Sequence, residues 1–170
     1  MTARILILTG ASSTGKSSVA RELQRLSQEP AIFLESDRFG LPSDARSRSA
    51  LRTRGALNEQ SLQLRMNTAF YQTVRLWFEN SVSVIAETIF RDDNQLSICR
   101  SSLGEVPYSI ARLVCEDAVR LDREHRRTDR RSGTAQITAE TEVVPAHLDL
   151  ELDTSRRTPF EAAVVLLRFL

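Results

Sequence analysis

One short segment near the start of the sequence combines glycine, lysine and serine at a spacing suited to binding phosphate. Residues 10–17 read Gly-Ala-Ser-Ser-Thr-Gly-Lys-Ser, which matches the P-loop pattern of a glycine, any four residues, a glycine, a lysine and a serine or threonine. The glycines permit backbone angles that point successive N–H groups into one concave nest for phosphate oxygens. We therefore expect the nucleotide to bind at Gly10, Ala11, Ser12, Ser13, Thr14, Gly15, Lys16, Ser17 and Ser18.

Two side chains of this loop predict the cofactors. Lys16, the only lysine in the chain, would neutralise the β- and γ-phosphates of ATP, and the hydroxyl of Ser17 would coordinate Mg²⁺. An apolar run precedes the loop and a helical pattern follows it, so the positive end of a helix dipole would also face the phosphates. The competing interpretation is a serine-rich turn that contains a lysine by coincidence.

A P-loop alone does not distinguish a kinase from a switch GTPase or a motor ATPase. Three observations favour a kinase. With 170 residues the chain is too short for an AAA-type ATPase, it contains no Asn-Lys-x-Asp-like tetrad for reading guanine, and it carries a cluster of arginines in its second half.

That arginine cluster predicts a helical lid over the nucleotide, within about residues 120–138. Residues 120–131 read RLDREHRRTDRR, and arginines three or four positions apart share one face of a helix. Guanidinium groups there would clamp the transferring phosphoryl group and replace bulk water. The alternative is a solvated helix whose arginines pair with neighbouring acids. The arginines on this face are Arg120, Arg123, Arg127 and Arg130, of which we assign Arg127 and Arg130 to catalysis.

Two acidic residues are candidates for the acceptor side of the reaction. Asp37 lies just beyond the second apolar run, and Glu87 directly follows the third. Ligands of open parallel sheets bind beyond the carboxyl ends of the strands, where a carboxylate can accept the proton of a hydroxyl acceptor. We assign Asp37 to catalysis and Glu87 to a magnesium-bound water, and leave the exchange of these roles open. Asp37 as a helix N-cap and Glu87 as an ion-pair partner of a lid arginine are the structural alternatives.

Strands and helices must position these residues, and their order predicts an α/β protein. Apolar runs that suit buried strands alternate with helical patterns about five times, which predicts a five-stranded parallel sheet in a three-layer α/β/α fold. The expected strands are residues 3–9, 31–34, 82–86, 108–114 and 148–152, and the expected helices are residues 16–27, 59–80, 91–102, 117–131 and a last one from Pro159. We expect residues 1–170 to form a single domain, with the acceptor-binding region at about residues 37–80.

Composition limits the partners. The formal net charge is only +1 and no apolar run is long enough to span a bilayer, so we expect neither nucleic acid nor a membrane as partner. Cys99 and Cys115 lack metal-ligand spacing, and we expect two reduced thiols in a cytoplasmic protein. The oligomeric state is left open, a homo-oligomer included.

The sequence resembles the chloramphenicol phosphotransferase-like family of P-loop kinases over most of its length. The resembling segments are Ile5–Ser17, with its Ser-Ser-x-Gly-Lys-Ser form, Phe33–Asp37, Val84–Phe90, Val114–Asp117 followed by Arg123, Glu124, Arg127, Asp129 and Arg130, and Leu152–Ser155. The poorest match lies between residues 40 and 80.

This resemblance implies a nucleoside- or nucleotide-kinase-like fold and ATP-dependent O-phosphorylation of a small-molecule hydroxyl, as in antibiotic inactivation. It implies Asp37 as catalytic base, an acidic residue at Glu87, and a loop beside the adenine after the last strand. We therefore add Arg123, Arg127, Thr154 and Arg156 to the ATP site, and assign Asp37, Arg38, Glu87 and Arg91 to acceptor binding.

The acceptor region departs from the family pattern, because it is shorter and rich in arginine. Its arginines suit an anionic acceptor or a solvent-facing surface, and they are Arg38, Arg46, Arg48, Arg52 and Arg54. Two other functions stay open: a nucleotide, shikimate-type or toxin-type sugar-nucleotide kinase, and a nucleotide-binding regulator with little turnover.

Overall fold

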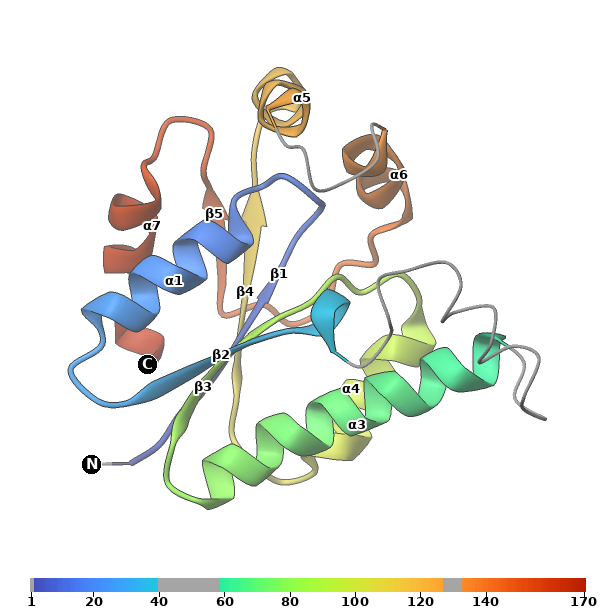
Figure 1. The fold of residues 1–170 in the computed structure, drawn as a ribbon, viewed down its shortest axis with the longest axis vertical. Coiled ribbons are helices and arrows are strands. Elements are labelled where there is room, and N and C mark those ends of the chain that lie inside the picture. The colour runs from blue at the N-terminus through green and yellow to red at the C-terminus, as the bar shows by residue number, and fades with distance from the viewer. Residues whose placement is uncertain (1, 40–58, 127–132) are drawn as a thin grey trace.

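A parallel five-stranded sheet in the order β2-β3-β1-β4-β5 forms the centre of the protein (Figure 1). The computed structural model describes residues 2–39, 59–126 and 133–170. The elements are β1 (Ile5–Thr9), α1 (Lys16–Leu26), β2 (Ala31–Glu35), the 3₁₀ turn η1 (Ser36–Arg38), α3 (Glu59–Glu79), β3 (Ser83–Glu87), α4 (Asp93–Leu103), β4 (Ser109–Val114), α5 (Asp117–His125), α6 (Thr134–Thr141), β5 (Leu150–Asp153), α7 (Pro159–Leu166) and η2 (Leu167–Phe169).

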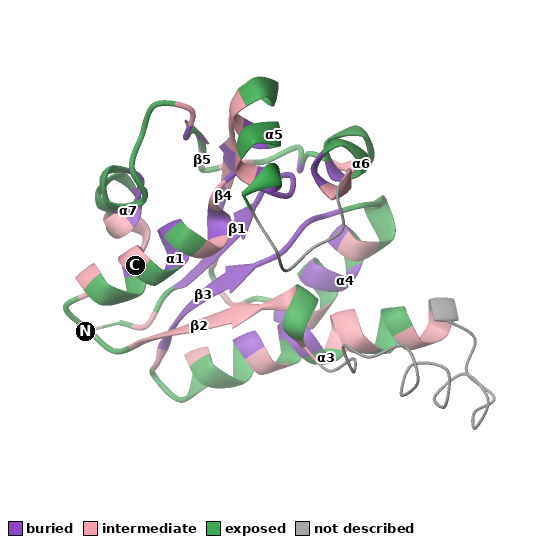
Figure 2. Cartoon of the chain, turned by 45° about the horizontal axis from the view of Figure 1, so that its top comes forward, coloured by how far each residue is buried: buried purple, intermediate pink, exposed green. Residues whose placement is uncertain are grey.

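The predicted fold class is confirmed, and its layers follow from alternation along the strands. In β1, Ile5 and Ile7 belong to the core formed with α3 and α4, whereas Leu6 and Leu8 belong to the core formed with α1 and α7. Successive side chains of a strand point to opposite faces, so a strand covered by helices on both faces is apolar throughout. Figure 2 shows the result, with β1 and β3 buried and the outer faces of the helices exposed.

The strand order places β1 at the point where the side on which new strands are added to the sheet changes. The chain first adds β2 and β3 on one side of β1, and then crosses to its other side for β4 and β5. Ligands of open α/β sheets bind at such a reversal, outside the carboxyl ends of the strands. The loop after β1, the turn η1 after β2 and the loop after β3 all lie at this edge, as do α5 and α6 (Figure 1).

Most expected elements agree with the structure to within about two residues, but the basic helix is an exception. The predicted helix over residues 117–131 ends at His125 in α5, and Arg126 is its C-cap. A separate short helix, α6, lies after residues 127–132, which are outside the described residues. The sequence pattern did not predict this helix. The reason is that α6 is capped by a side chain from another helix, as described below.

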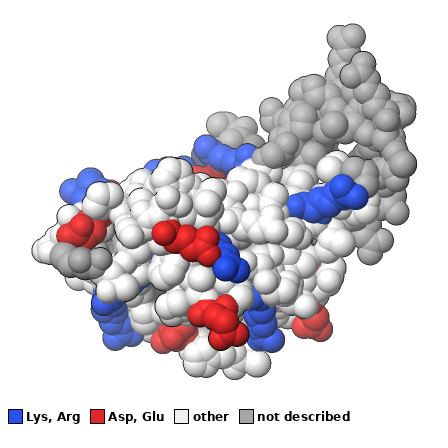
Figure 3. All heavy atoms as spheres, turned by 90° about the horizontal axis from the view of Figure 1, so that it is seen from below, with Lys and Arg blue, Asp and Glu red and all other residues white. Residues whose placement is uncertain are grey.

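Charged side chains are interspersed rather than gathered on the face shown in Figure 3, where acidic and basic residues lie next to one another. In the described part of the chain, no helix has the length and apolar character needed to cross a bilayer.

Candidate active site

The loop after β1 forms the floor of the larger of two neighbouring pockets. This pocket has a volume of about 420 Å³. Such a volume lies within the range of roughly 300–1,000 Å³ that is typical of small-molecule sites. The pocket is lined by Ser12, Ser13, Thr14, Gly15, Lys16, Ser17, Ser18, Val19, Arg21, Glu35, Arg38, Glu87, Arg123, Thr154, Arg157 and Pro159.

The backbone of this loop has the conformation that a phosphate nest requires. Ser13 and Gly15 both have positive φ values, of 66° and 95°. A side chain at Gly10 would overlap the backbone carbonyl of Leu113 in β4, so only glycine fits where the loop leaves the sheet. No side chain caps the first turn of α1, and that turn contains no acidic residue. The positive end of the helix dipole therefore faces the pocket without a competing carboxylate.

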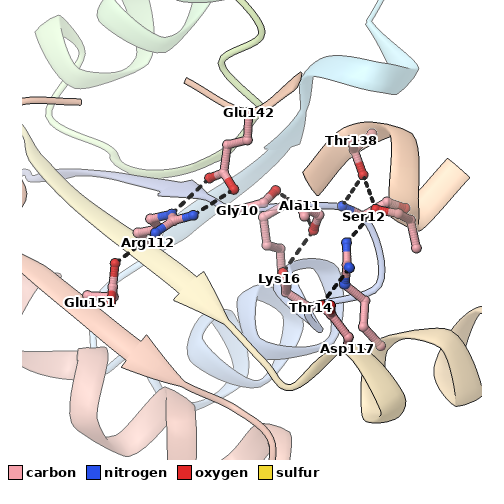
Figure 4. Close-up of polar contacts among 12 residues, drawn as sticks. Gly10, Ala11, Ser12, Thr14, Lys16, Arg112, Asp117, Thr138, Glu142 and Glu151 are labelled. Atoms are coloured by element: carbon pink, nitrogen blue, oxygen red, sulfur yellow. Dashed lines mark hydrogen bonds and ion pairs between the residues drawn. The ribbon is translucent and has the colours of Figure 1, made fainter. Parts of the chain in front are cut away.

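Lys16 is buried at the centre of this site (Figure 4). Its ammonium group donates hydrogen bonds to the carbonyl oxygens of Gly10, at 2.7 Å, and Ala11, at 2.8 Å. The same Nζ atom lies 3.9 Å from Oε1 of Glu87, at the end of β3. The loop's own carbonyls thus hold the ammonium in place at the edge of the pocket.

Glu87 has a carboxylate oxygen that could accept a hydrogen bond from a metal-bound water. The residue is 8% exposed, and its Oε2 atom has no hydrogen-bond partner among the described residues. A buried carboxylate oxygen without a partner is costly unless a cation or a water satisfies it. Ser17 lines the same pocket, so both groups expected at Mg²⁺ face one cavity. The residues present fit a hydrated divalent cation.

Thr154 and Arg123 join the middle of the loop to β5 and α5. The hydroxyl of Thr154 donates to the carbonyl oxygen of Thr14 at 2.8 Å. Arg123 donates to the carbonyl and hydroxyl oxygens of Thr154, at 2.7 and 3.1 Å. Two residues expected at the nucleotide therefore meet at the pocket wall.

Two side chains of α5, the first helix of the arginine cluster, contact α6 and not the pocket. Arg120 is buried and donates to Asp117 and to the carbonyl oxygen of Ala135, so it does not line the pocket with Arg123. The buried carboxylate of Glu124 accepts hydrogen bonds from the backbone N–H groups of Gly133, at 3.2 Å, and Ala135, at 2.6 Å. Because these are the first amides of α6, Glu124 acts as its N-terminal cap. In turn, Thr138 of α6 accepts a hydrogen bond from the backbone of Ser12 (Figure 4).

Several expected site residues lie elsewhere than predicted. Arg38 lines the nucleotide pocket and forms a 2.6 Å ion pair with Glu35, rather than lining the acceptor pocket. Arg157 lines the nucleotide pocket, whereas Arg156 does not. Asp37 lies within η1, whose N-cap is Glu35, so it is not a helix N-cap. Among the described residues, Glu87 lies near Lys16, and neither Arg120 nor Arg123 forms an ion pair with it. Outside the described residues lie Arg46, Arg48, Arg52, Arg54, Arg127 and Arg130.

The second pocket is formed by η1, α3 and the residues after β3. Asp37 and Arg91, both expected to bind the acceptor, line it together. The expected acceptor region extended only to residue 80, and so missed Thr88 and Gln95, which also line this pocket. On α3, the polar residues Gln63 and Asn67 are spaced by one helical turn, a signal that the sequence did contain.

The sheet order and the phosphate-binding loop define a kinase fold of the P-loop class. The chain belongs to the chloramphenicol phosphotransferase-like family, whose model matches residues 3–170. This membership confirms the resemblance noted from the sequence. A comparison with curated proteins gave no match.

Solved structures of low sequence identity share this fold. A sugar kinase from a Janibacter species is 16% identical, covers 98% of this chain and 94% of its own, and has a TM-score of 0.73. A gluconokinase from Sinorhizobium meliloti is 19% identical, with 97% and 91% coverage and a TM-score of 0.68. The APS kinase of Mycobacterium tuberculosis, in complex with AMPPNP and APS, is 16% identical, with 99% and 97% coverage and a TM-score of 0.68.

Proposed function

We propose that this protein transfers the γ-phosphate of ATP to a hydroxyl group of a small molecule. The observation that carries the proposal is a pair of neighbouring pockets with a small cavity whose lining residues belong to both. A small cavity of about 10 Å³ shares Glu35 and Glu87 with the nucleotide pocket, and it shares Asp37 and Thr88 with the second pocket. A donor and an acceptor bound in the two pockets would therefore meet at this junction.

The proposed reaction at this junction is an in-line phosphoryl transfer in which Asp37 accepts the proton. The acceptor's hydroxyl oxygen forms a bond to the γ-phosphorus while the bond from that phosphorus to the bridging oxygen breaks. The bridging oxygen keeps the electron pair and leaves with ADP, and the acceptor's proton passes to the carboxylate of Asp37 and then to solvent. Products are ADP and a phosphate monoester.

The loop and the cations stabilise the charge that moves. Backbone amides of the loop and the ammonium of Lys16 balance the negative charge on the phosphate oxygens. Mg²⁺, when bound, supplies further positive charge there, and Ser17 together with Glu87 through a water would hold it. Arg123, which lines this pocket, would contact the nucleotide from the pocket wall.

Support for the proposal comes from the family, whose name is that of a phosphotransferase, and from neighbours that are kinases of small molecules. The family name makes an antibiotic hydroxyl one candidate acceptor, so chloramphenicol belongs in any screen. A nucleotide-binding regulator is the alternative that a turnover measurement excludes.

The test is acceptor-dependent release of ADP, followed by mass detection of the phosphorylated product. Lys16→Ala is the matched inactive control, and we expect it to lower turnover by at least ~100-fold, the scale of losing one preorganised electrostatic contact to the transition state. Nucleotide binding without turnover across a broad acceptor panel would contradict the proposal. Parental turnover in Lys16→Ala would remove the loop from the mechanism.

A further inference from the structure

The second pocket is small and almost wholly polar where the structure describes it. Its volume is about 110 Å³, well below the roughly 300–1,000 Å³ of sites for drug-sized ligands. Only Met66 and Ile89 contribute apolar side chains. The polar lining residues are Ser36, Asp37, Gln63, Asn67, Tyr71, Thr88, Arg91 and Gln95.

Two side-chain NH₂ groups, of Asn67 on α3 and Gln95 on α4, line this pocket without an acceptor among the described residues. Gln63 donates to the amide oxygen of Asn67 at 3.1 Å, and the amide oxygen of Gln95 accepts from the backbone N–H of Arg91 at 2.8 Å. Among the described residues, nothing accepts from the side-chain NH₂ groups of Asn67 and Gln95. Both amides thus have their oxygens engaged and their donors available, which suits a ligand rich in oxygen acceptors.

Charge is separated along the pocket. Asp37 lies at the junction with the nucleotide pocket, because it lines both the second pocket and the connecting cavity. Arg91 and Gln95 line the second pocket but not the connecting cavity. Arg91 has no ion pair with any described residue, so its guanidinium is available to a carboxylate or phosphate.

The remaining wall stays neutral. Tyr71 donates to the hydroxyl of Thr88 at 3.4 Å, and burial raises the pKa of Tyr71 well above its usual value of 10. Its phenol therefore remains uncharged at neutral pH. Asp37 is the one acidic residue among the described lining residues, and it lies at the reacting end.

We infer that the phosphate acceptor is a small polyhydroxylated anion, with its reacting hydroxyl at Asp37 and its anionic group on Arg91. This inference rests on the proposed function and specifies its acceptor class. A site that hydrogen-bonds several hydroxyls favours ligands that carry them over analogues that lack them. A bulky aromatic acceptor matches neither the volume nor the lining of the described pocket.

The experiment compares kcat/KM for matched acceptors with ATP and Mg²⁺. Sugar acids of three to six carbons, such as gluconate, are paired with neutral polyols of the same length, such as sorbitol. Glucose 6-phosphate tests whether phosphate replaces carboxylate, and chloramphenicol tests the aromatic alternative. The variant Arg91→Gln removes the cation, and Arg65→Gln, at an exposed position of α3 that does not line the pocket, is the matched control.

We expect the anionic acceptors to exceed their neutral partners in kcat/KM by about tenfold or more, the effect of one charge-assisted hydrogen-bonded pair. Arg91→Gln should abolish this preference by lowering kcat/KM for the anionic acceptors to about the value of their neutral partners, whereas Arg65→Gln should keep the parental preference. Better phosphorylation of neutral polyols or chloramphenicol, or an unchanged preference in Arg91→Gln, would overturn the inference while the proposed function stands. If no acceptor at all is phosphorylated, the proposed function fails as well.

Discussion

The backbone N–H of Ser12 donates a 2.9 Å hydrogen bond to the hydroxyl oxygen of Thr138, which lies 126 positions further along the chain. The hydroxyl of Thr138 itself donates to the carbonyl oxygens of Thr134, at 2.9 Å, and Ala135, at 3.1 Å. Its oxygen is therefore held toward the phosphate-binding loop. The first part of that loop is fixed by α6 and not only by its own turn.

Thr138→Val keeps the shape of the side chain but removes the acceptor for Ser12. We expect the KM for ATP to rise about five- to tenfold, from the ~1 kcal/mol that a typical hydrogen bond contributes, with a smaller change in kcat. Thr138→Ser, which keeps a hydroxyl, should restore most of the affinity. A parental KM in Thr138→Val would show that this contact does not position the loop, and a melting curve would separate loss of affinity from loss of fold.

Asp37→Asn tests the general base. We expect turnover to fall by at least ~100-fold, the scale of losing general-base catalysis, while the affinity for ATP changes little, because Asp37 does not line the nucleotide pocket. Single-turnover kinetics and nucleotide titration measure the two effects separately. Asp93→Asn, at an exposed position of α4 that does not line the acceptor pocket, should keep near-parental turnover. Normal turnover in Asp37→Asn would shift the base assignment to Glu87.

Glu142→Gln tests the ion pair that joins the end of α6 to the sheet. The side chain of Glu142 is only 3% exposed, and both its oxygens accept from Arg112 of β4, at 3.0 and 3.1 Å (Figure 4). These hydrogen bonds raise the pKa of Arg112 above its usual value. Because Arg112 keeps Glu151 as a second partner, we expect the free energy of unfolding to fall by about 1–3 kcal/mol. This is less than the roughly 3–5 kcal/mol expected when a buried charge loses its only partner.

Thermal or urea unfolding measures this loss. Glu151→Gln is the matched control on the same arginine, and since Glu151 is 51% exposed its loss should be under about 1 kcal/mol. Equal effects of the two substitutions would contradict the role assigned to burial.

The two cysteines should differ in their reaction with an alkylating reagent. Burial raises the pKa of the Cys99 thiol to about 12, and the residue is 1% exposed. At pH 8 it should stay unmodified in the folded protein and react only after unfolding, since the thiolate is the nucleophile. The pKa of Cys115 is also raised by burial, but this residue is only half-buried, so it should react slowly and faster as the pH rises.

Peptide mass spectrometry after timed labelling reads out both sites.

The raised pKa of Cys99 has a consequence for stability as well. The folded state binds the proton more tightly, so this contribution to the free energy of unfolding is complete below the unfolded pKa of about 8.5 and is lost as pH rises toward 12. Labelling of Cys99 in the folded protein at the rate of Cys115 would contradict its assigned environment.

The strands, the long helix α3 and the phosphate-binding loop were predictable because local signals define them. Alternating apolar runs specify buried parallel strands, and Gly10 with Lys16 marks a turn of fixed geometry. The helix α6 was not predictable in this way. Its sequence, TAQITAET, has a weak helical pattern, and its N-terminal cap comes from Glu124 on another helix. Such a tertiary cap leaves no trace at the start of the helix itself.

The acceptor pocket shows the same limit. Asp37 and Arg91 could be proposed because each follows a strand, but Gln63, Asn67 and Gln95 join them only when α3 packs against α4. Local sequence also placed Arg120 and Arg123 on one face of a helix, which is correct at that level. It did not reveal that α6 would cover Arg120 and leave Arg123 at the pocket.

The bonds that Lys16 makes to the carbonyl oxygens of Gly10 and Ala11 set a limit on what a nucleotide gains. An incoming phosphate would share the ammonium with these oxygens, and the favourable free energy of the new contact would be reduced by whatever the lysine gives up to its own backbone. A ligand too short to present a phosphate there leaves the lysine with its own backbone. Discrimination between ATP and its shorter relatives would therefore depend on a cation that the loop's own carbonyl oxygens already hold.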